Sequence, residues 1–147
     1  MLFRSIGLAE GASLVIGGDA PDDPALAQGA YLMPTVFDGV SNDMRIAREE
    51  IFGPVVSIIP FDTEEEALRL ANATPYGLAG SIWSRDIGKA LRAAKALQAG
   101  VISVNSNSSV NTEAPFGGYK MSGIGRELGM SALDLYTETK NVFIDLT

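Results

Sequence analysis

Strand-like and helix-like segments alternate through the middle of the chain, and this order is the strongest constraint on its fold. The strand-like runs are Val55–Phe61, Leu78–Trp83 and Val101–Val104. Thr63 begins the first intervening helix as its N-cap, with Glu66 at the capping-box position, and Asp86 begins the second, which Gly100 ends. A β-α-β-α-β order predicts an α/β fold, with a mostly parallel sheet, right-handed crossovers and flanking helices.

The residues before this alternating region predict shorter elements. Leu2–Ala12 predicts a helix, Ser13–Ile16 predicts a strand, and Asp19–Gly29 has the composition of a surface loop. Tyr31–Phe37 predicts a further strand. Because Pro34 cannot donate to a ladder of hydrogen bonds, we expect that strand at the edge of a sheet.

The residues after Asn105 predict a long loop and a protruding strand. A polar, glycine-rich segment extends to about Gly125, and a short helix is expected near Arg126–Leu135. In the last eleven residues, 137–147, apolar side chains alternate along an extended strand. Terminal strands of this kind commonly complete a sheet that belongs to another chain.

The chain has no cysteine and no histidine, which limits its chemistry. Their absence excludes a Ser-His-Asp triad, a Cys-His dyad, a thiolate or imidazole metal site and a disulfide framework. The formal charge of −7 opposes binding to a phosphate backbone or an anionic membrane surface. No apolar run is long enough for a signal core or a membrane span, so we expect a cytoplasmic protein without nucleic-acid or membrane partners.

An acidic and aromatic segment, Glu-Glu-Ile-Phe-Gly-Pro at residues 49–54, stands just before the Val55 strand. A carboxylate at a strand end can accept two hydrogen bonds from a ribose diol, and a nearby ring can lie against a nicotinamide. In a second interpretation Glu49 and Glu50 are solvated charges and Phe52 belongs to the core. Taken alone, the pattern favours the second interpretation.

Glycines are concentrated at residues 117–129. They do not form a dinucleotide-binding fingerprint, because Leu128 stands where that motif needs glycine and no strand directly precedes it. We expect them to permit sharp turns and close approach of another backbone segment. Lys120, Arg126 and Glu127 are expected to hold this loop in place through ion pairs.

Small polar side chains fill residues 103–111, Ser-Val-Asn-Ser-Asn-Ser-Ser-Val-Asn. Such residues after a parallel strand can line a pocket at the carboxyl end of a sheet. A solvated loop rich in serine and asparagine fits the same pattern equally well.

Four motifs, at residues 50–54, 72–78, 100–105 and 115–127, together resemble the C-terminal part of the NAD(P)-dependent aldehyde dehydrogenase superfamily. Their order and spacing are those of the family, and the resemblance covers essentially the whole chain. It assigns residues 1–136 to the C-terminal portion of the catalytic domain and 137–147 to the oligomerisation strand.

The resemblance also implies roles for individual residues. Glu50 would hold the nicotinamide-side ribose of NAD or NADP, and Phe52 would pack near that ribose and ring. The wall of the substrate tunnel would include Ser106, Ser108, Val110 and Phe116. Glu127 would be an auxiliary residue near the catalytic base that helps to relay its proton. Thr137–Leu146 would pair across subunits of a homo-oligomer.

The family reaction needs groups that are missing from these 147 residues: the nucleophilic cysteine, the general-base glutamate, the oxyanion-hole asparagine and the Rossmann-type domain. In that reaction a thiolate attacks the aldehyde, hydride passes to the nicotinamide, and the thioester is hydrolysed to a carboxylic acid. We therefore expect the chain alone to be inactive and not to bind the cofactor tightly. A non-catalytic oligomerisation or interaction module, and one half of a split enzyme, are the alternatives.

Overall fold

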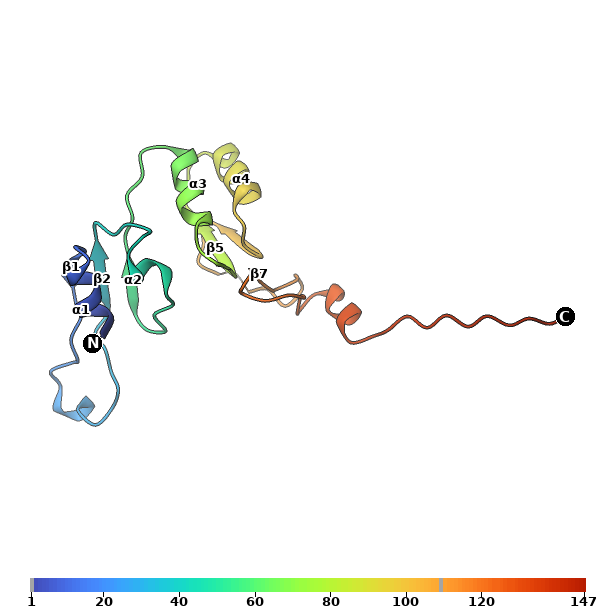
Figure 1. Ribbon diagram of the computed structural model, residues 1–147, viewed down its shortest axis with the longest axis horizontal. Helices are drawn as coiled ribbons and strands as arrows, with labels where there is room; N and C mark the ends of the chain where they lie inside the picture. Colours follow the sequence, from blue (N-terminus) through green and yellow to red (C-terminus); the bar gives the residue numbers. More distant parts are fainter. Residues whose placement is uncertain (1, 109) are drawn as a thin grey trace. The chain divides into compact units, whose positions relative to one another are not determined.

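The computed structural model describes residues 2–108 and 110–147 and divides into two compact units, Met1–Ala73 and Thr74–Thr147 (Figure 1). The first unit contains α1 (Leu2–Ala9), β1 (Ser13–Ile16), the 3-10 helix η1 (Pro24–Leu26), β2 (Thr35–Asp38), α2 (Arg45–Arg48), β3 (Val55–Ser57) and α3 (Glu64–Asn72). The second contains β4 (Tyr76–Gly77), β5 (Ala79–Ile82), α4 (Ile87–Ala96), β6 (Val101–Val104), β7 (Tyr119–Lys120) and the 3-10 helix η2 (Met130–Leu135). Helices and strands occur in both units, which confirms the α/β class.

β2 is the central strand of the sheet in the first unit. β1 pairs with it in antiparallel orientation, and β3 pairs in parallel, with Thr35 opposite Val55. The prediction of an edge strand is wrong at this position. Pro34 precedes the first strand residue and therefore removes no hydrogen bond from the ladder, and the strand begins at Thr35 rather than at Tyr31.

The alternating region contributes strands to three small sheets rather than to one continuous sheet. β5 and β6 form a parallel pair joined by α4, as the alternation predicted. β3 instead pairs with β2, and β4 pairs with β7 in antiparallel orientation. The order of elements along a chain favours a type of connection, but it does not decide which strands become neighbours. Here β2, which lies before the alternating region, provides the ladder for β3.

The core of the first unit surrounds Phe37, whose side chain is 1% exposed. Its buried neighbours are Ala12, Val40 and Ile46. α1 packs close to this cluster because Gly7 has no side chain, and a Cβ there would stand 3.0 Å from Cδ1 of Ile46. Glycine inside a helix ordinarily costs about 0.5–1 kcal/mol, and here it permits the close packing.

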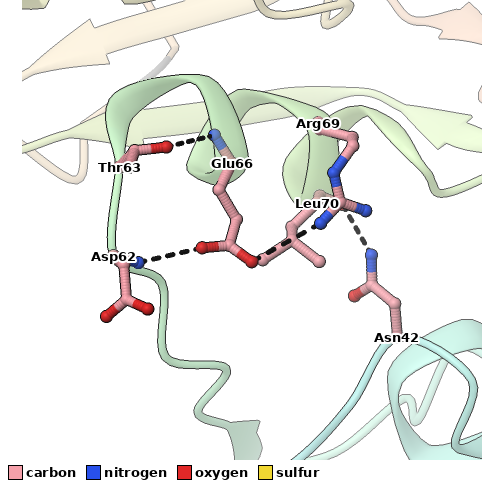
Figure 2. Close-up of polar contacts among 6 residues, drawn as sticks. All are labelled: Asn42, Asp62, Thr63, Glu66, Arg69 and Leu70. Carbon is pink, nitrogen blue, oxygen red and sulfur yellow. Dashed lines mark hydrogen bonds and ion pairs between the residues drawn. The ribbon is translucent and has the colours of Figure 1, made fainter.

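α3 begins at the predicted N-cap Thr63, but Glu66 reaches back to the amide of the residue before the cap and not to that of Thr63, so the predicted capping box forms only in part. The hydroxyl of Thr63 accepts a hydrogen bond from the amide of Glu66 at 3.1 Å, and the Glu66 carboxylate accepts one from the amide of Asp62 at 3.0 Å (Figure 2). At the other end, Nδ2 of Asn42 donates to the carbonyl of Leu70 at 2.9 Å. Side chains therefore satisfy backbone groups at both ends of the helix.

α4 begins after its N-cap Asp86, also as predicted, and this cap depends on pH. Oδ1 of Asp86 accepts a hydrogen bond from the amide of Lys89 at 3.1 Å. That backbone hydrogen bond is the largest cause that lowers the pKa of Asp86 below its usual value of 3.8. The ionised side chain of Asp86 therefore stabilises the folded state at pH values above 3.8.

We expect the stabilising effect of ionised Asp86 to disappear as the pH falls through its folded-state pKa. In an Asp86→Asn variant the side-chain amide would still cap the helix, but it cannot ionise. The wild-type chain should therefore be the more stable of the two near neutral pH, and the difference should shrink as the pH is lowered to about 2. Urea unfolding of both proteins at the two pH values measures this, and a difference that grows in acid would contradict it.

The C-terminal part of the second unit differs from the predicted helix at Arg126–Leu135. Only η2, a 3-10 helix, forms, because Gly125, Leu128 and Gly129 have positive φ angles of 85°, 60° and 59°, which an α-helix cannot include. Residues 138–147 have no regular secondary structure and are exposed. Their pairing across subunits, and the predicted domain boundary at residues 136 and 137, stay predictions.

Candidate functional site

The loop at residues 49–54 leaves two prominent side chains in solvent and partly buries one. Ile51 is half-buried and packs against the core cluster of the first unit. Glu50, the residue before it, is exposed, and Phe52, the residue after it, is 98% exposed. The interpretation that placed Phe52 in the core is therefore wrong, and its ring is accessible to a ligand.

The two neighbouring glutamates in this loop differ in their partners. The Glu49 carboxylate forms a bidentate pair with the Arg45 guanidinium, at 2.6 and 2.9 Å, which lowers the pKa of Glu49 and raises that of Arg45. Within residues 2–108 and 110–147, no hydrogen bond or ion pair engages the Glu50 carboxylate. A free carboxylate can accept two hydrogen bonds from the hydroxyls of a ribose. Of these two carboxylates, only that of Glu50 is free to accept such hydrogen bonds.

A pocket of about 90 Å³ borders the loop. Its lining residues are Phe3, Arg4, Gly18, Leu32, Thr35, Phe37, Ile51 and Val55. Ligand pockets usually enclose about 300–1,000 Å³, so this space is too small for a dinucleotide. It is a gap in the packing beside Ile51.

In the second unit, the structure brings together two residues that the sequence analysis selected separately. The amide of Phe116 donates to the carbonyl of Glu127, and the amide of Glu127 donates to the carbonyl of Phe116, both at 2.7 Å. Phe116 is half-buried, whereas Glu127 is exposed. The proposed tunnel residue and the proposed auxiliary residue therefore share one backbone bridge.

Polar groups hold the beginning of the loop that follows β6. The hydroxyls of Ser81 and Ser103 lie 2.8 Å apart, and each donates to the carbonyl of Ser106, at 2.6 and 2.7 Å. The side chain of Asn105 accepts from the amide of Ser84 at 2.9 Å and donates to its carbonyl at 3.0 Å. The contributions of Ser81 and Ser84 were not predicted from the sequence. An asparagine directly after a strand was the available signal, because asparagine readily adopts the φ of 54° seen here.

The other predicted tunnel residues lie further along this loop. The hydroxyl of Ser106 accepts a hydrogen bond from the amide of Ser108 at 3.0 Å. Val110 is 59% exposed, and Ser109 lies outside the described residues. The loop leaves the carboxyl end of the parallel β5–β6 pair, which is where α/β proteins bind ligands.

The glycine-rich loop is held by close backbone contacts, as its composition predicted. The amide of Gly100 donates to the carbonyl of Gly77 at 3.0 Å, and a Cβ at Gly100 would stand 1.7 Å from the carbonyl oxygen of Gly117. Arg126 donates to the carbonyls of Gly118 and Gly125, at 2.9 and 2.6 Å. The predicted ion pair is wrong at Arg126, which tethers the loop by binding backbone carbonyls rather than carboxylates.

Comparison with known proteins identifies the family. The model of the aldehyde dehydrogenase family matches residues 3–142. The chain belongs to this family. Betaine aldehyde dehydrogenase of Bacillus subtilis is 49% identical over 141 residues, which are 96% of this chain and 29% of that protein. The 2-hydroxymuconic semialdehyde dehydrogenase of Pseudomonas putida is 48% identical over 93% of this chain and 28% of its own length.

Solved structures of aldehyde dehydrogenases share this fold. Betaine aldehyde dehydrogenase of Staphylococcus aureus in complex with NAD⁺ superimposes with a TM-score of 0.89 at 47% identity, over 92% of this chain and 27% of that one. Mycobacterium tuberculosis aldehyde dehydrogenase in complex with NAD⁺ superimposes with a TM-score of 0.91 at 44% identity, over 98% of this chain and 29% of that one. The chain thus spans less than a third of the length of these relatives. No helix among the described residues has the length and apolar character needed to cross a membrane.

Proposed function

We propose that these residues form part of the catalytic domain of an enzyme that oxidises an aldehyde to a carboxylic acid through a thioester, with NAD as the hydride acceptor. The family membership supports the reaction class. Relatives that are 44–47% identical to this chain over the aligned residues have been solved with NAD⁺. The observation that carries the proposal is the unpaired, exposed Glu50 beside the exposed ring of Phe52.

In this proposal Glu50 and Phe52 act on the cofactor. The two oxygens of the Glu50 carboxylate accept hydrogen bonds from the ribose on the nicotinamide side. The ring of Phe52 packs against that ribose and the nicotinamide and keeps water from them. Bound NAD supplies the hydride acceptor. Cysteine, general base and oxyanion-hole groups come from residues outside these 147, and the chain alone does not hold NAD tightly.

Residues that would contact the aldehyde are proposed within the second unit. We assign the wall of the substrate tunnel to Ser106, Ser108, Val110 and Phe116, and an auxiliary role near the general base to Glu127. The hydrogen bonds of Ser106 and the bridge between Phe116 and Glu127 would keep this wall in place. The relatives are named for different aldehydes, including betaine aldehyde and 2-hydroxymuconic semialdehyde. The proposal therefore covers the aldehyde group and not one substrate.

We also propose that Thr137–Leu146 mediates homo-oligomerisation of a cytoplasmic enzyme. Four large apolar side chains in this segment are at least 69% exposed: Val142, Phe143, Ile144 and Leu146. Their backbone has no partner strand among the described residues. An extended apolar segment of this kind is suited to pairing with the sheet of another subunit. In this assignment residues 1–136 belong to the catalytic domain.

A chimera tests the cofactor assignment. Residues 3–142 replace the matching segment of the Bacillus subtilis betaine aldehyde dehydrogenase, and NADH formation from betaine aldehyde is followed. In this chimera we expect Glu50→Gln to raise the KM for NAD⁺ by about 10- to 100-fold, because hydrogen bonds to a charged group contribute about 1.5–3 kcal/mol.

Glu65→Gln is the matched control, since Glu65 is an exposed glutamate in the first turn of α3. It should leave the KM unchanged. Equal effects of the two substitutions, or no effect of Glu50→Gln, would contradict the role of Glu50. A chimera that forms no NADH with any tested aldehyde would count against the proposed function itself.

A further inference from the structure

The exposed pair Glu50 and Phe52 lies in a loop that is fixed by contacts within the first unit. Resting on the function proposed above, we propose that Ile51 and the Arg45–Glu49 pair are positioning residues. They hold the loop so that the Glu50 carboxylate and the Phe52 ring are presented together to the cofactor. Neither Ile51, Arg45 nor Glu49 would contact the cofactor.

Ile51 is the apolar anchor of the loop. It is half-buried against the core cluster around Phe37, while the residues before and after it are exposed. Its burial leaves the side chains on either side of it in the sequence, Glu50 and Phe52, exposed to solvent. The pocket of about 90 Å³ that Ile51 borders would become larger if its side chain were shortened.

Arg45 and Glu49 fix the residue that precedes Glu50. The amide of Glu49 donates to the carbonyl of Arg45 at 2.9 Å, and the two side chains form the bidentate pair already described. The amide of Arg45 in turn donates to the Glu10 carboxylate at 2.8 Å, which satisfies the start of α2 where Met44 offers no side-chain cap. Glu49 is thus held through both its backbone and its side chain.

The other end of the loop is held by β2. The amide of Gly53 donates to the carbonyl of Ile51 at 2.7 Å, and that of Val55 donates to the carbonyl of Gly53 at 2.8 Å. The amide of Thr35, at the start of β2, donates to the carbonyl of Pro54 at 2.8 Å. With both ends fixed, binding would cost little ordering of the loop.

Ile51→Ala and Val40→Ala form a matched pair of core truncations. Val40 is 3% exposed in the same core cluster, but it follows the end of β2 opposite to the Thr35–Pro54 contact. Both substitutions should lower the urea concentration at the midpoint of unfolding by similar amounts. In the chimera we expect only Ile51→Ala to raise the KM for NAD⁺, by about 10-fold with kcat changed less than about 2-fold, because it loosens a binding loop and not the reacting groups.

Glu49→Gln tests the upstream contact in the 147-residue chain itself, by amide hydrogen exchange. Loss of the charged pair should speed exchange at Gly53 about 10-fold and leave Val101, in β6, unchanged. Equal changes in KM for Ile51→Ala and Val40→Ala, no change in KM for Ile51→Ala, or unchanged exchange at Gly53 would each overturn the inference. If Glu50→Gln raises the KM for NAD⁺ while Ile51→Ala leaves it unchanged, the positioning role fails and the proposed function stands. If Glu50→Gln also leaves the KM for NAD⁺ unchanged, the cofactor role of Glu50 fails.

Discussion

The 147-residue chain, mixed with NAD⁺ and an aldehyde, is expected to form no NADH above the uncatalysed background. It has no cysteine to form the thioester and no histidine to replace it. Loss of the nucleophile lowers turnover by about 10⁶-fold in another covalent enzyme, and the groups that remain do not compensate. The chain is purified by gel filtration coupled to light scattering, which gives its oligomeric state. The absorbance of NADH is then followed with protein from the same peak.

The chimera, in which residues 3–142 stand within the Bacillus subtilis enzyme, is the positive control for this assay, because it supplies the remaining segments of an aldehyde dehydrogenase around the same residues. A discrete oligomer of the 147-residue chain without turnover would agree with a folded, non-catalytic state and with pairing through Thr137–Leu146. Turnover above background would contradict the argument from the nucleophile. Activity that appears only when a separate cysteine-containing polypeptide is added would instead support a split enzyme.

Gly100→Ala is expected to destabilise the second unit by about 3 kcal/mol, the upper part of the range for overpacked sites. The new Cβ would stand 1.7 Å from the carbonyl oxygen of Gly117 and 2.8 Å from its carbonyl carbon. Because these are backbone atoms, no side-chain rotamer can relieve the overlap. The loop that carries Phe116 would have to move away from the start of β6. Urea unfolding, followed by circular dichroism, measures the loss.

Gly53→Ala is the matched control for this substitution. A Cβ at Gly53 would meet no atom within 4 Å, and Gly53 does not have a positive φ. This variant should change the unfolding free energy by less than about 1 kcal/mol, since neither overlap nor strained backbone results. Similar losses in both variants would show that the contact between Gly100 and Gly117 does not determine the stability of the loop.

Features set by neighbouring residues could be predicted from the sequence alone. The strands Ser13–Ile16 and Val101–Val104 have the predicted bounds, and the N-caps Thr63 and Asp86 were found in advance. A cap depends on a side chain and a backbone amide that are three residues apart, so its chemistry is visible in a short window. The four family motifs were likewise read from local sequence, and the family match confirms the family they indicated.

Contacts between distant residues were decided only by the tertiary structure. The sequence could not show that Thr35 and Val55 would be neighbours, that Phe52 would lie in solvent, or that Phe116 would bridge to Glu127. Strand patterns specify which residues extend, but the partner of each strand depends on the burial of all the others. The sequence by itself therefore determined the elements, their caps and the family, whereas packing determined strand order and which candidate side chains remain free to bind.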